Sequence, residues 1–380
     1  MDQRAAFLEA ALWHGSLDAA AAILAAHPDI AGSDIHTVAV LGDEAAVRRF
    51  LAQDPGNATA KSAPYGGDAL NHLCLSKYLR LDPTRSDGFL GAATALLDAG
   101  ADPNTGFWTT GQHPERETAL YGAAGVAHHA ALTRLLLEHG ADPNYQRQRG
   151  WLALHHAIAR DNNLNIIELL LDHGADPRLR KDGASAVARA ARRGRGDVLA
   201  LFERRGIPIE LRGVDRLIAA CARNDPAAIR AIADREPDLV REIIARGGQL
   251  LAEFAGTWNT DGVRHLLDLG VSATALYEGD GYFDIAQDST ALHVAAWKGL
   301  PATVQLLIAR GAPVDAKDGK GRTALALAVK ACVDSYWTER RTPASVAALL
   351  DAGASPSGAL YPSGYAEVDA LLAARGASAS

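Results

Sequence analysis

Apolar residues along this chain fall into short helical stripes that are separated by turn residues. The stretch 290–315 shows the pattern most clearly. Thr290 stands where a helix begins, because its hydroxyl can accept a hydrogen bond from a free backbone N–H. Gly299 and Gly311 each end a helix, since glycine adopts the left-handed conformation at low cost, and Pro313 prevents continuation. Two short helices are therefore expected, with these buried residues: Leu292, Ala295, Ala296, Val304, Leu306 and Leu307.

The same unit recurs along the chain. Three stretches open with Thr-Ala-Leu, at Thr118, Thr290 and Thr323. Other stretches close with Gly-Ala-Asp-Pro-Asn or a near copy, namely 100–104, 140–144, 174–178, 311–315 and 353–356. Self-similarity at a period of about 20–50 residues is the signature of a solenoid, in which stacked neighbours bury a continuous core. Because a solenoid usually acts as a surface, the repetition favours binding over catalysis.

These phrases resemble the ankyrin repeat, whose pattern runs Thr-Pro-Leu-His, Ala-Ala, Gly, Val-x-Leu-Leu and Gly-Ala-Asp. Alanine replaces the proline of the first phrase throughout. The resemblance implies a β-hairpin finger and two antiparallel helices in each unit. We therefore expect an all-α ankyrin-repeat solenoid of about nine or ten stacked helix pairs, with β-hairpin fingers and several loop insertions. The resemblance also implies that His155 and His293 bond the backbone of adjacent fingers, which is a structural role.

The repeats predict one elongated domain, because each unit touches only its neighbours. We expect no flexible linker, even in the least regular junction, between Arg205 and Leu217. Leu267 aligns with a buried position in the second helix of its unit. The domain spans 1–376 and has three parts: degenerate N-terminal repeats at 1–67, main repeats at 68–353 and a C-terminal cap at 354–376.

Insertions interrupt the repeats at 57–67, 82–87, 105–116, 277–289 and 333–343. Aromatic residues make up only 6% of the chain, yet they recur in all of these insertions but 82–87. Exposed aromatic side chains are typical of binding hot spots. Alternatively, each aromatic side chain folds back and fills its own loop, because large apolar side chains seldom stay exposed. Both interpretations remain open for Tyr65, Phe107, Trp108, Tyr282, Phe283, Tyr336 and Trp337, and for His113 beside them.

Composition narrows the function further. A net charge of -7 disfavours general nucleic-acid binding. Cys74, Cys221 and Cys332 are far apart and form no zinc or redox motif, which fits a reducing compartment. The longest apolar stretch, around Ala19–Ala26, is too short to span a bilayer, and the N-terminus lacks the pattern of a secretory signal. We therefore expect a cytoplasmic protein without membrane association.

No sequence motif assigns catalysis. The chain has neither a Gly-x-Ser-x-Gly elbow nor a phosphate-binding Gly-x-x-x-x-Gly-Lys-Ser/Thr loop. The adjacent pairs His128–His129 and His155–His156 point to different faces of a helix, unlike the ligands of a helical zinc site. We therefore assign no catalytic residue, cofactor or metal. Acids in the fingers, such as Glu117 and Asp284, leave an acid–base site in the concave groove open.

Positive charge concentrates in 178–212, which holds ten Lys or Arg residues against four Asp or Glu residues. One interpretation is a local patch that steers an acidic partner by long-range attraction. The other, which we slightly prefer, is a solvated face that is balanced by acids of neighbouring units.

The resemblance implies which side chains face a partner, because in ankyrin repeats the finger residues and the end of the first helix do so. Trp151 and Trp297 are expected to lie off the buried stripe and to act as binding anchors. The partner-binding candidates are Trp108, Trp151, Arg160, Arg192, Arg193, Tyr282, Phe283, Ser289, Trp297, Lys298, Arg322 and Lys330.

We therefore expect a protein-interaction module or scaffold that binds a protein partner through the concave groove and the enlarged fingers. The alternative is a small-molecule-binding or enzymatic protein with a pocket formed by the aromatic-rich insertions. A scaffold associated with an intracellular effector or toxin is a third interpretation, and no residue distinguishes it.

Overall fold

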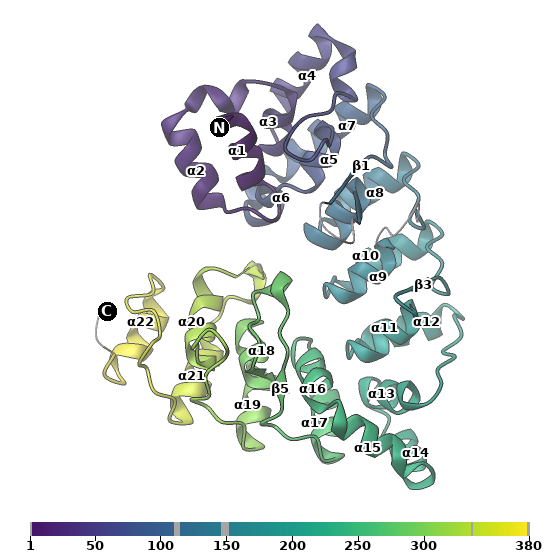
Figure 1. The fold of residues 1–380 in the computed structure, drawn as a ribbon, viewed down its shortest axis with the longest axis vertical. Coiled ribbons are helices and arrows are strands. Elements are labelled where there is room, and N and C mark those ends of the chain that lie inside the picture. The colour runs from purple at the N-terminus through teal and green to yellow at the C-terminus, as the bar shows by residue number, and fades with distance from the viewer. Residues whose placement is uncertain (1, 110–114, 146–151, 336, 378–380) are drawn as a thin grey trace. The chain divides into compact units, whose positions relative to one another are not determined.

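The computed structural model describes residues 2–109, 115–145, 152–335 and 337–377. Pairs of antiparallel helices, joined by short turns and hairpin fingers, follow one another along the chain (Figure 1). This arrangement confirms the predicted all-α repeat of helix pairs with β-hairpin fingers. Trp151, His113 and Tyr336 lie outside the described residues.

Contacts between residues divide the chain into two compact units, Met1–Ala186 and Val187–Ser380, which we call unit 1 and unit 2. The junction at Arg205–Leu217 lies inside unit 2, and residues 207–212 of this junction have no regular secondary structure. In the described part of the chain, no helix combines the length and the apolar content needed to cross a membrane.

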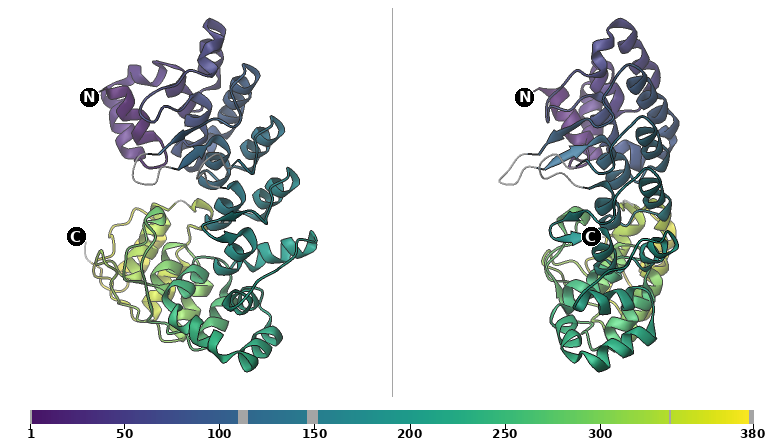
Figure 2. Two further views of the ribbon diagram at one scale, coloured as in Figure 1. Left: turned by 45° about the vertical axis from the view of Figure 1, so that its right-hand side comes forward. Right: turned by 90° about the vertical axis from the view of Figure 1, so that its right-hand side faces the viewer.

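Unit 1 is built from short helices and two small hairpins. The α-helices are α1 (Gln3–Ala11), α2 (Leu17–Ala26), α3 (Ile35–Val40), α4 (Glu44–Gln53), α5 (Ala69–Cys74), α6 (Lys77–Leu81), α7 (Ser86–Asp98), α8 (Ala130–Glu138), α9 (Ala153–Ala159) and α10 (Leu164–Asp172). Single turns of 3₁₀-helix occupy η1 (Pro28–Gly32), η2 (Pro55–Ala58) and η3 (Pro83–Arg85), and η4 (Tyr121–Val126) is a π-helix. The hairpins pair β1 (Gly106–Trp108) with β2 (Arg116–Thr118), and β3 (Arg180–Lys181) with β4 (Ala184–Ser185). Strands β1 and β2 stand out from the helices of unit 1 (Figure 2).

Unit 2 repeats the same plan. Its α-helices are α11 (Ala186–Arg192), which starts at the boundary, α12 (Gly196–Arg204), α13 (Val214–Ala222), α14 (Pro226–Arg235), α15 (Pro237–Ala245), α16 (Gly247–Ala255), α17 (Thr260–Asp268), α18 (Ala291–Trp297), α19 (Pro301–Ala309), α20 (Ala324–Val333), α21 (Ala344–Asp351) and α22 (Ala366–Ala373). Strand β5 (Leu276–Tyr277) pairs antiparallel with β6 (Ser289–Thr290), and single turns of 3₁₀-helix lie at η5 (Gly281–Phe283) and η6 (Thr338–Arg340).

The repeated closing phrase joins consecutive repeats by hydrogen bonds. The side-chain oxygen of Asn104 accepts from the N–H of Asp142 at 2.8 Å, and that of Asn144 accepts from the N–H of Asp176 at 2.8 Å. The finger histidines act as the resemblance implied. Nε2 of His293 lies 3.0 Å from the carbonyl oxygen of Ala316, in the next finger. These polar groups are satisfied between repeats, which fixes the spacing of the stack.

The apolar stripes form the core of each repeat, with two corrections. The side chains of Val304 and Leu307 are fully buried, as the pattern predicted, but Leu306 is only half-buried, because it lies at the edge of the stripe of α19. The prediction for Leu267 was wrong in register, because Leu266 is fully buried and Leu267 is only half-buried. The buried stripe of α17 runs through Val263 and Leu266, three residues apart, so Leu267 falls at its edge.

Candidate functional site

An enlarged finger in unit 2 supplies most of the candidate site. Its strands β5 and β6 pair Tyr277 with Ser289, and the residues between these two turn back through η5. Asp280 caps this turn, because its side chain accepts from the N–H of Tyr282 at 3.0 Å. Asp284 ends the turn in the left-handed conformation with φ of 54°, which directs the chain back toward β6.

A cation–aromatic cluster lies beneath this finger and consists of Phe283, Trp297, Lys298 and Trp337. The indole N–H of Trp297 donates to the carbonyl oxygen of Phe283 at 2.5 Å, which fastens the finger to the end of α18. Trp297 and Trp337 meet edge to face, with 6.2 Å between ring centroids. The ammonium of Lys298 lies 3.3 Å from the centroid of Phe283 and 4.2 Å from that of Trp337.

The position of Lys298 is energetically unusual. This residue is 1% exposed, and a buried cation is costly unless other groups compensate for lost water. The faces of Phe283 and Trp337 carry negative partial charge, so they attract the ammonium. Arg193 adds a second cation above Phe283, at 5.5 Å from its centroid, and forms an ion pair with Glu253. The cluster is therefore a packed, charge-compensated core beneath the finger.

An accessible rim borders the cluster, and we call it the Asp284 rim. Three cations surround the Asp284 carboxylate: Lys320 at 2.6 Å, Arg322 at 2.8 Å and Lys330 at 3.0 Å. Tyr282, in the same turn as Asp284, completes the rim and is half-buried. Burial would raise the pKa of Asp284, but hydrogen bonds from Lys320 and Lys330 and the charge of Arg322 outweigh it and lower the pKa to about 2. The carboxylate stays ionised and holds the three cations together.

The structure places eight of the predicted candidates in or beside the enlarged finger of unit 2, at two levels. Five of them are less than a tenth exposed and support the finger from below: Arg193, Phe283, Ser289, Trp297 and Lys298. Tyr282, Arg322 and Lys330 belong to the rim and are partly exposed. Phe283 and Trp337 are therefore buried, as one of the two interpretations of the insertion aromatics expected, but they pack against each other across two insertions instead of each filling only its own loop.

The expectation that Trp297 lies off the buried stripe was wrong, because this residue is only 2% exposed. Its place at the end of α18 follows the repeat pattern, but two insertions cover it. The finger packs through Phe283, and the insertion after α20 packs through Trp337. A pattern taken from uninterrupted repeats does not contain these covering segments.

The remaining candidates lie apart from the rim. Arg192 is exposed and forms an ion pair with Asp215 at 2.8 Å. In unit 1, Trp108 is 39% exposed on β1, while its neighbour Phe107 is buried against Tyr65, with 4.9 Å between ring centroids. Arg160, which follows α9, is half-buried.

Several basic residues of the stretch 178–212 form ion pairs with acids from their own and neighbouring repeats. Arg192 pairs with Asp215, Arg195 with Asp197 at 2.8 Å, and Lys181 with Glu115 at 3.1 Å. This agrees with the interpretation of a balanced face.

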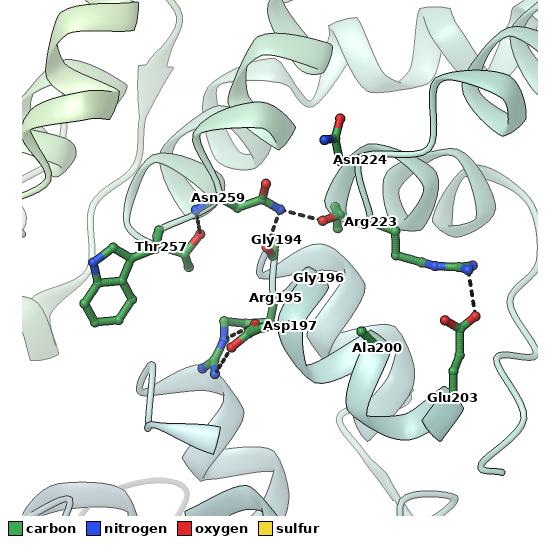
Figure 3. Close-up of a pocket in the computed structure, with 12 residues that line it drawn as sticks. Gly194, Arg195, Gly196, Asp197, Ala200, Glu203, Arg223, Asn224, Thr257 and Asn259 are labelled. Atoms are coloured by element: carbon green, nitrogen blue, oxygen red, sulfur yellow. Dashed lines mark hydrogen bonds and ion pairs between the residues drawn. The ribbon is translucent and has the colours of Figure 1, made fainter. Parts of the chain in front are cut away.

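A second feature of unit 2 is a hollow of about 420 Å³ that the sequence did not indicate. It is lined by three inter-helix turns, at 194–197, 222–224 and 257–259 (Figure 3). The amide of Asn259 joins these turns by donating to the carbonyl oxygens of Gly194 at 2.8 Å and Ala222 at 2.6 Å (Figure 3).

Charged side chains of the hollow are paired with each other, Arg195 with Asp197 and Arg223 with Glu203 (Figure 3). Trp258 at its edge is 59% exposed, and the guanidinium of Arg340 lies 3.6 Å from its ring centroid. An aromatic residue in a polar inter-helix turn was the signal that could have found this hollow.

Metal chemistry receives no support from the described residues, where no group of three or more His, Cys, Asp or Glu side chains could hold an ion. Asp284 and Lys320 were missed as site residues by sequence reasoning. The signal was the finger sequence Lys317-Asp318-Gly319-Lys320-Gly321-Arg322, in which basic residues alternate with turn residues.

Comparison with known proteins gives matches to repeat families. The family described as "Ankyrin repeats (3 copies)" matches residues 84–181 and 120–212, and "Ankyrin repeat" matches residues 287–319. The serine/threonine-protein kinase 12 of Arabidopsis thaliana is 42% identical over 83 residues, which are 22% of this chain and 16% of that protein. This chain thus spans less than a fifth of that relative. The family matches, the repeated phrases and the paired helices lead to one assignment: the chain belongs to the ankyrin repeat proteins.

Proposed function

We propose that this chain is a protein-binding module or scaffold that contacts its partner through the Asp284 rim. Ankyrin repeats are generally protein-interaction modules, which supports the class of function. The single observation that carries the choice of surface is the convergence of Arg322 and Lys330 on the carboxylate of Asp284, two residues after the half-buried Tyr282. Tyrosine and arginine are residue types that dominate binding energy at protein interfaces.

The buried candidates have a different role in this proposal. Trp297, Lys298 and Phe283 hold the finger in one conformation, so the rim loses little conformational entropy when a partner binds. Trp297 is thus a supporting residue of the binding surface and does not itself contact the partner.

The experiment is affinity capture from a lysate of the source organism with three versions of the full chain. These are the unmodified protein, the double variant Arg322→Ala/Lys330→Ala, and the control Arg310→Ala. Arg310 is also a partly exposed arginine in an ion pair, with Asp268 at 2.7 Å, but it follows α19 and lies outside the rim. We expect a stoichiometric partner that the double variant loses and the control retains. Equal capture by all three versions would contradict the rim assignment.

A second candidate function is binding of a small molecule, and the observation that favours it is the hollow with Trp258 at its edge. A volume of about 420 Å³ falls within the range of ligand pockets. The sequence analysis had placed a small-molecule pocket in the aromatic-rich insertions. The hollow lies instead between inter-helix turns. Native mass spectrometry of the purified chain tests it, since a bound metabolite should be lost in Trp258→Ala.

We also propose a cytoplasmic location. The described thiols of Cys74, Cys221 and Cys332 are free and buried, which suits a reducing compartment. Fluorescence microscopy of the tagged full chain tests this.

A further inference from the structure

We infer that the partner segment that binds the Asp284 rim is acidic, with carboxylates on either side of an apolar or aromatic side chain. This inference rests on the proposed function and names the chemistry of the partner. It follows from the charge balance of the rim, the donors that remain on its lysines, and the tyrosine beside them.

The charge balance favours an added anion. Lys320, Arg322 and Lys330 contribute three positive charges, while Asp284 and Asp318 contribute two negative charges, which leaves 3 − 2 = +1. The two acids are not equally accessible. The side chain of Asp318 is fully buried, whereas those of Lys320 and Lys330 are 58% and 39% exposed. An approaching group therefore meets more positive than negative charge.

Two arginines elsewhere in unit 2 provide a contrast to the rim. Arg192 has its own carboxylate, Asp215, and Arg193 has Glu253. On the rim, by contrast, three cations share Asp284. An acidic partner segment would supply the missing carboxylates.

The donors on the rim differ in how far they are used. Arg322 is fixed from two sides, because its Nε donates to Asp318 at 2.8 Å and its Nη2 donates to the carbonyl oxygen of Asp284 at 2.9 Å. Each lysine ammonium carries three N–H donors, and its bond to Asp284 uses one of them. Lys320 and Lys330 can therefore bind partner carboxylates without giving up Asp284.

Tyr282 supplies the apolar part of the surface. Its ring lies edge to face with buried Phe283, at 4.9 Å between centroids, so its position is fixed from below. A fixed tyrosine offers large contact area at low entropic cost. The partner segment should therefore combine acids with an apolar or aromatic residue.

Long-range repulsion does not oppose this partner strongly. The whole chain has a net charge of -7, but charges are screened beyond about 8 Å at physiological salt. A nucleic acid is disfavoured by comparison, because its closely spaced phosphates would bring more negative charge against Asp284 than the few carboxylates of a short peptide segment. Single-stranded RNA is therefore an outcome of the test and is not proposed.

The experiment uses a random dodecapeptide library displayed on phage and the immobilised full chain. We expect the selected peptides to be enriched in Asp and Glu around an apolar residue. A synthetic copy of the most enriched peptide should bind at least about tenfold more tightly than its copy with Gln and Asn in place of Glu and Asp. The variant Lys320→Ala/Lys330→Ala should weaken binding by a similar factor, while Arg310→Ala should not. Unchanged circular dichroism checks that each variant is folded.

The outcomes separate the inference from the proposed function. Neutral or basic peptides that still need Lys320 and Lys330 would overturn the acidic partner and leave the rim as the binding surface. Peptides that bind the double lysine variant as well as the unmodified chain would overturn both, as would a library with no enrichment. Tighter binding of a single-stranded RNA than of the acidic peptide would also overturn the inference.

Discussion

In two enlarged fingers of this chain, the surroundings shift the pKa of a carboxyl group in opposite directions. In unit 1, Glu117 lies on β2 and is 4% exposed, and its own buried oxygen Oε2 has no hydrogen-bond partner. Burial, followed by the charge of Glu115, raises the pKa of Glu117 to about 8, although the nearby indole of Trp13 and guanidinium of Arg160 lower it. In unit 2, Asp284 is surrounded by three cations and its pKa falls to about 2.

The comparison shows that the hairpin topology of a finger does not determine whether its carboxyl group is ionised. Both fingers are antiparallel hairpins that project an insertion with aromatic residues. The finger of unit 2 meets cations from the next repeat, Lys320, Arg322 and Lys330, whereas Glu117 meets the indole of Trp13. The first finger therefore favours a neutral acid, and the second favours an ionised one.

The largest expected effect concerns the support beneath the second finger. Trp337→Ala should destabilise unit 2 by about 3–5 kcal/mol, because it removes a buried indole and leaves a cavity beside Phe283 and Lys298. Urea unfolding followed by circular dichroism measures the change. The matched control is Trp258→Ala, which removes a 59% exposed indole and should cost about 1 kcal/mol or less. Similar losses in the two variants would show that the cluster is not the core of this region.

The same variant tests whether the two regions form one domain. We propose a single array over 1–376, as the repeats predict, in which neighbouring units stabilise each other. In that case, Trp337→Ala should lower the protection of backbone amide protons against hydrogen exchange in α4 as well as in α20. Limited proteolysis that cuts within 205–217 and gives two stable halves would contradict a single array.

The acid of unit 1 should make stability fall as the pH rises from 4.5 to about 8. A carboxyl group whose pKa is raised from 4.5 to about 8 stabilises the fold fully below pH 4.5, and this contribution is lost as the pH rises through 8. At about 1.4 kcal/mol per pH unit between these two pKa values, the loss approaches about 5 kcal/mol by pH 9. Glu117→Gln should remove most of this slope in urea unfolding at pH 5, 7 and 9. Glu138→Gln, at an exposed site on α8, is the control and should keep the slope. If the free energy of unfolding of Glu117→Gln changes with pH in parallel with that of the unmodified chain, the pH dependence does not come from Glu117.

Sequence reasoning found the parts of this structure that are local and repeated. The helix ends, the finger histidines and the buried stripe through Val304 and Leu307 follow from patterns within about one repeat. It failed where distant insertions fold onto a repeat. The repeat pattern placed Trp297 off the buried stripe. The residue is buried because two insertions, one before and one after it in the chain, cover its side chain. The spacing of residues within one repeat does not predict contacts with segments that are distant in the sequence.

The candidate site was found in part for the same reason. Arg322 and Lys330 were identified from their places in the repeat, and Tyr282 from its insertion. Asp284 was noted as one of several acids in the fingers. Its contact with three cations depends on its left-handed backbone conformation, which the sequence does not predict. Asparagine and aspartate adopt that conformation more readily than most residues, yet only some of them do.

The smallest expected effect is the counterpart of Glu117→Gln in the second finger. Asp284→Asn should destabilise the fold by about 1 kcal/mol at pH 7, because the amide cannot compensate the three cations; the value is small since the carboxylate is 33% exposed and solvent screens it. A carboxyl group with a pKa lowered from 3.8 to about 2 stabilises the fold above pH 3.8, and this contribution is lost as the pH falls through 2. Urea unfolding at pH 7 and pH 3 measures it, with Asp268→Asn in an exposed pair as the control. The same chemical change, acid to amide, should thus stabilise the first finger at pH 9 and destabilise the second at pH 7. If both amides stabilise, the cations of the rim do not depend on Asp284, and the contrast between the two fingers fails.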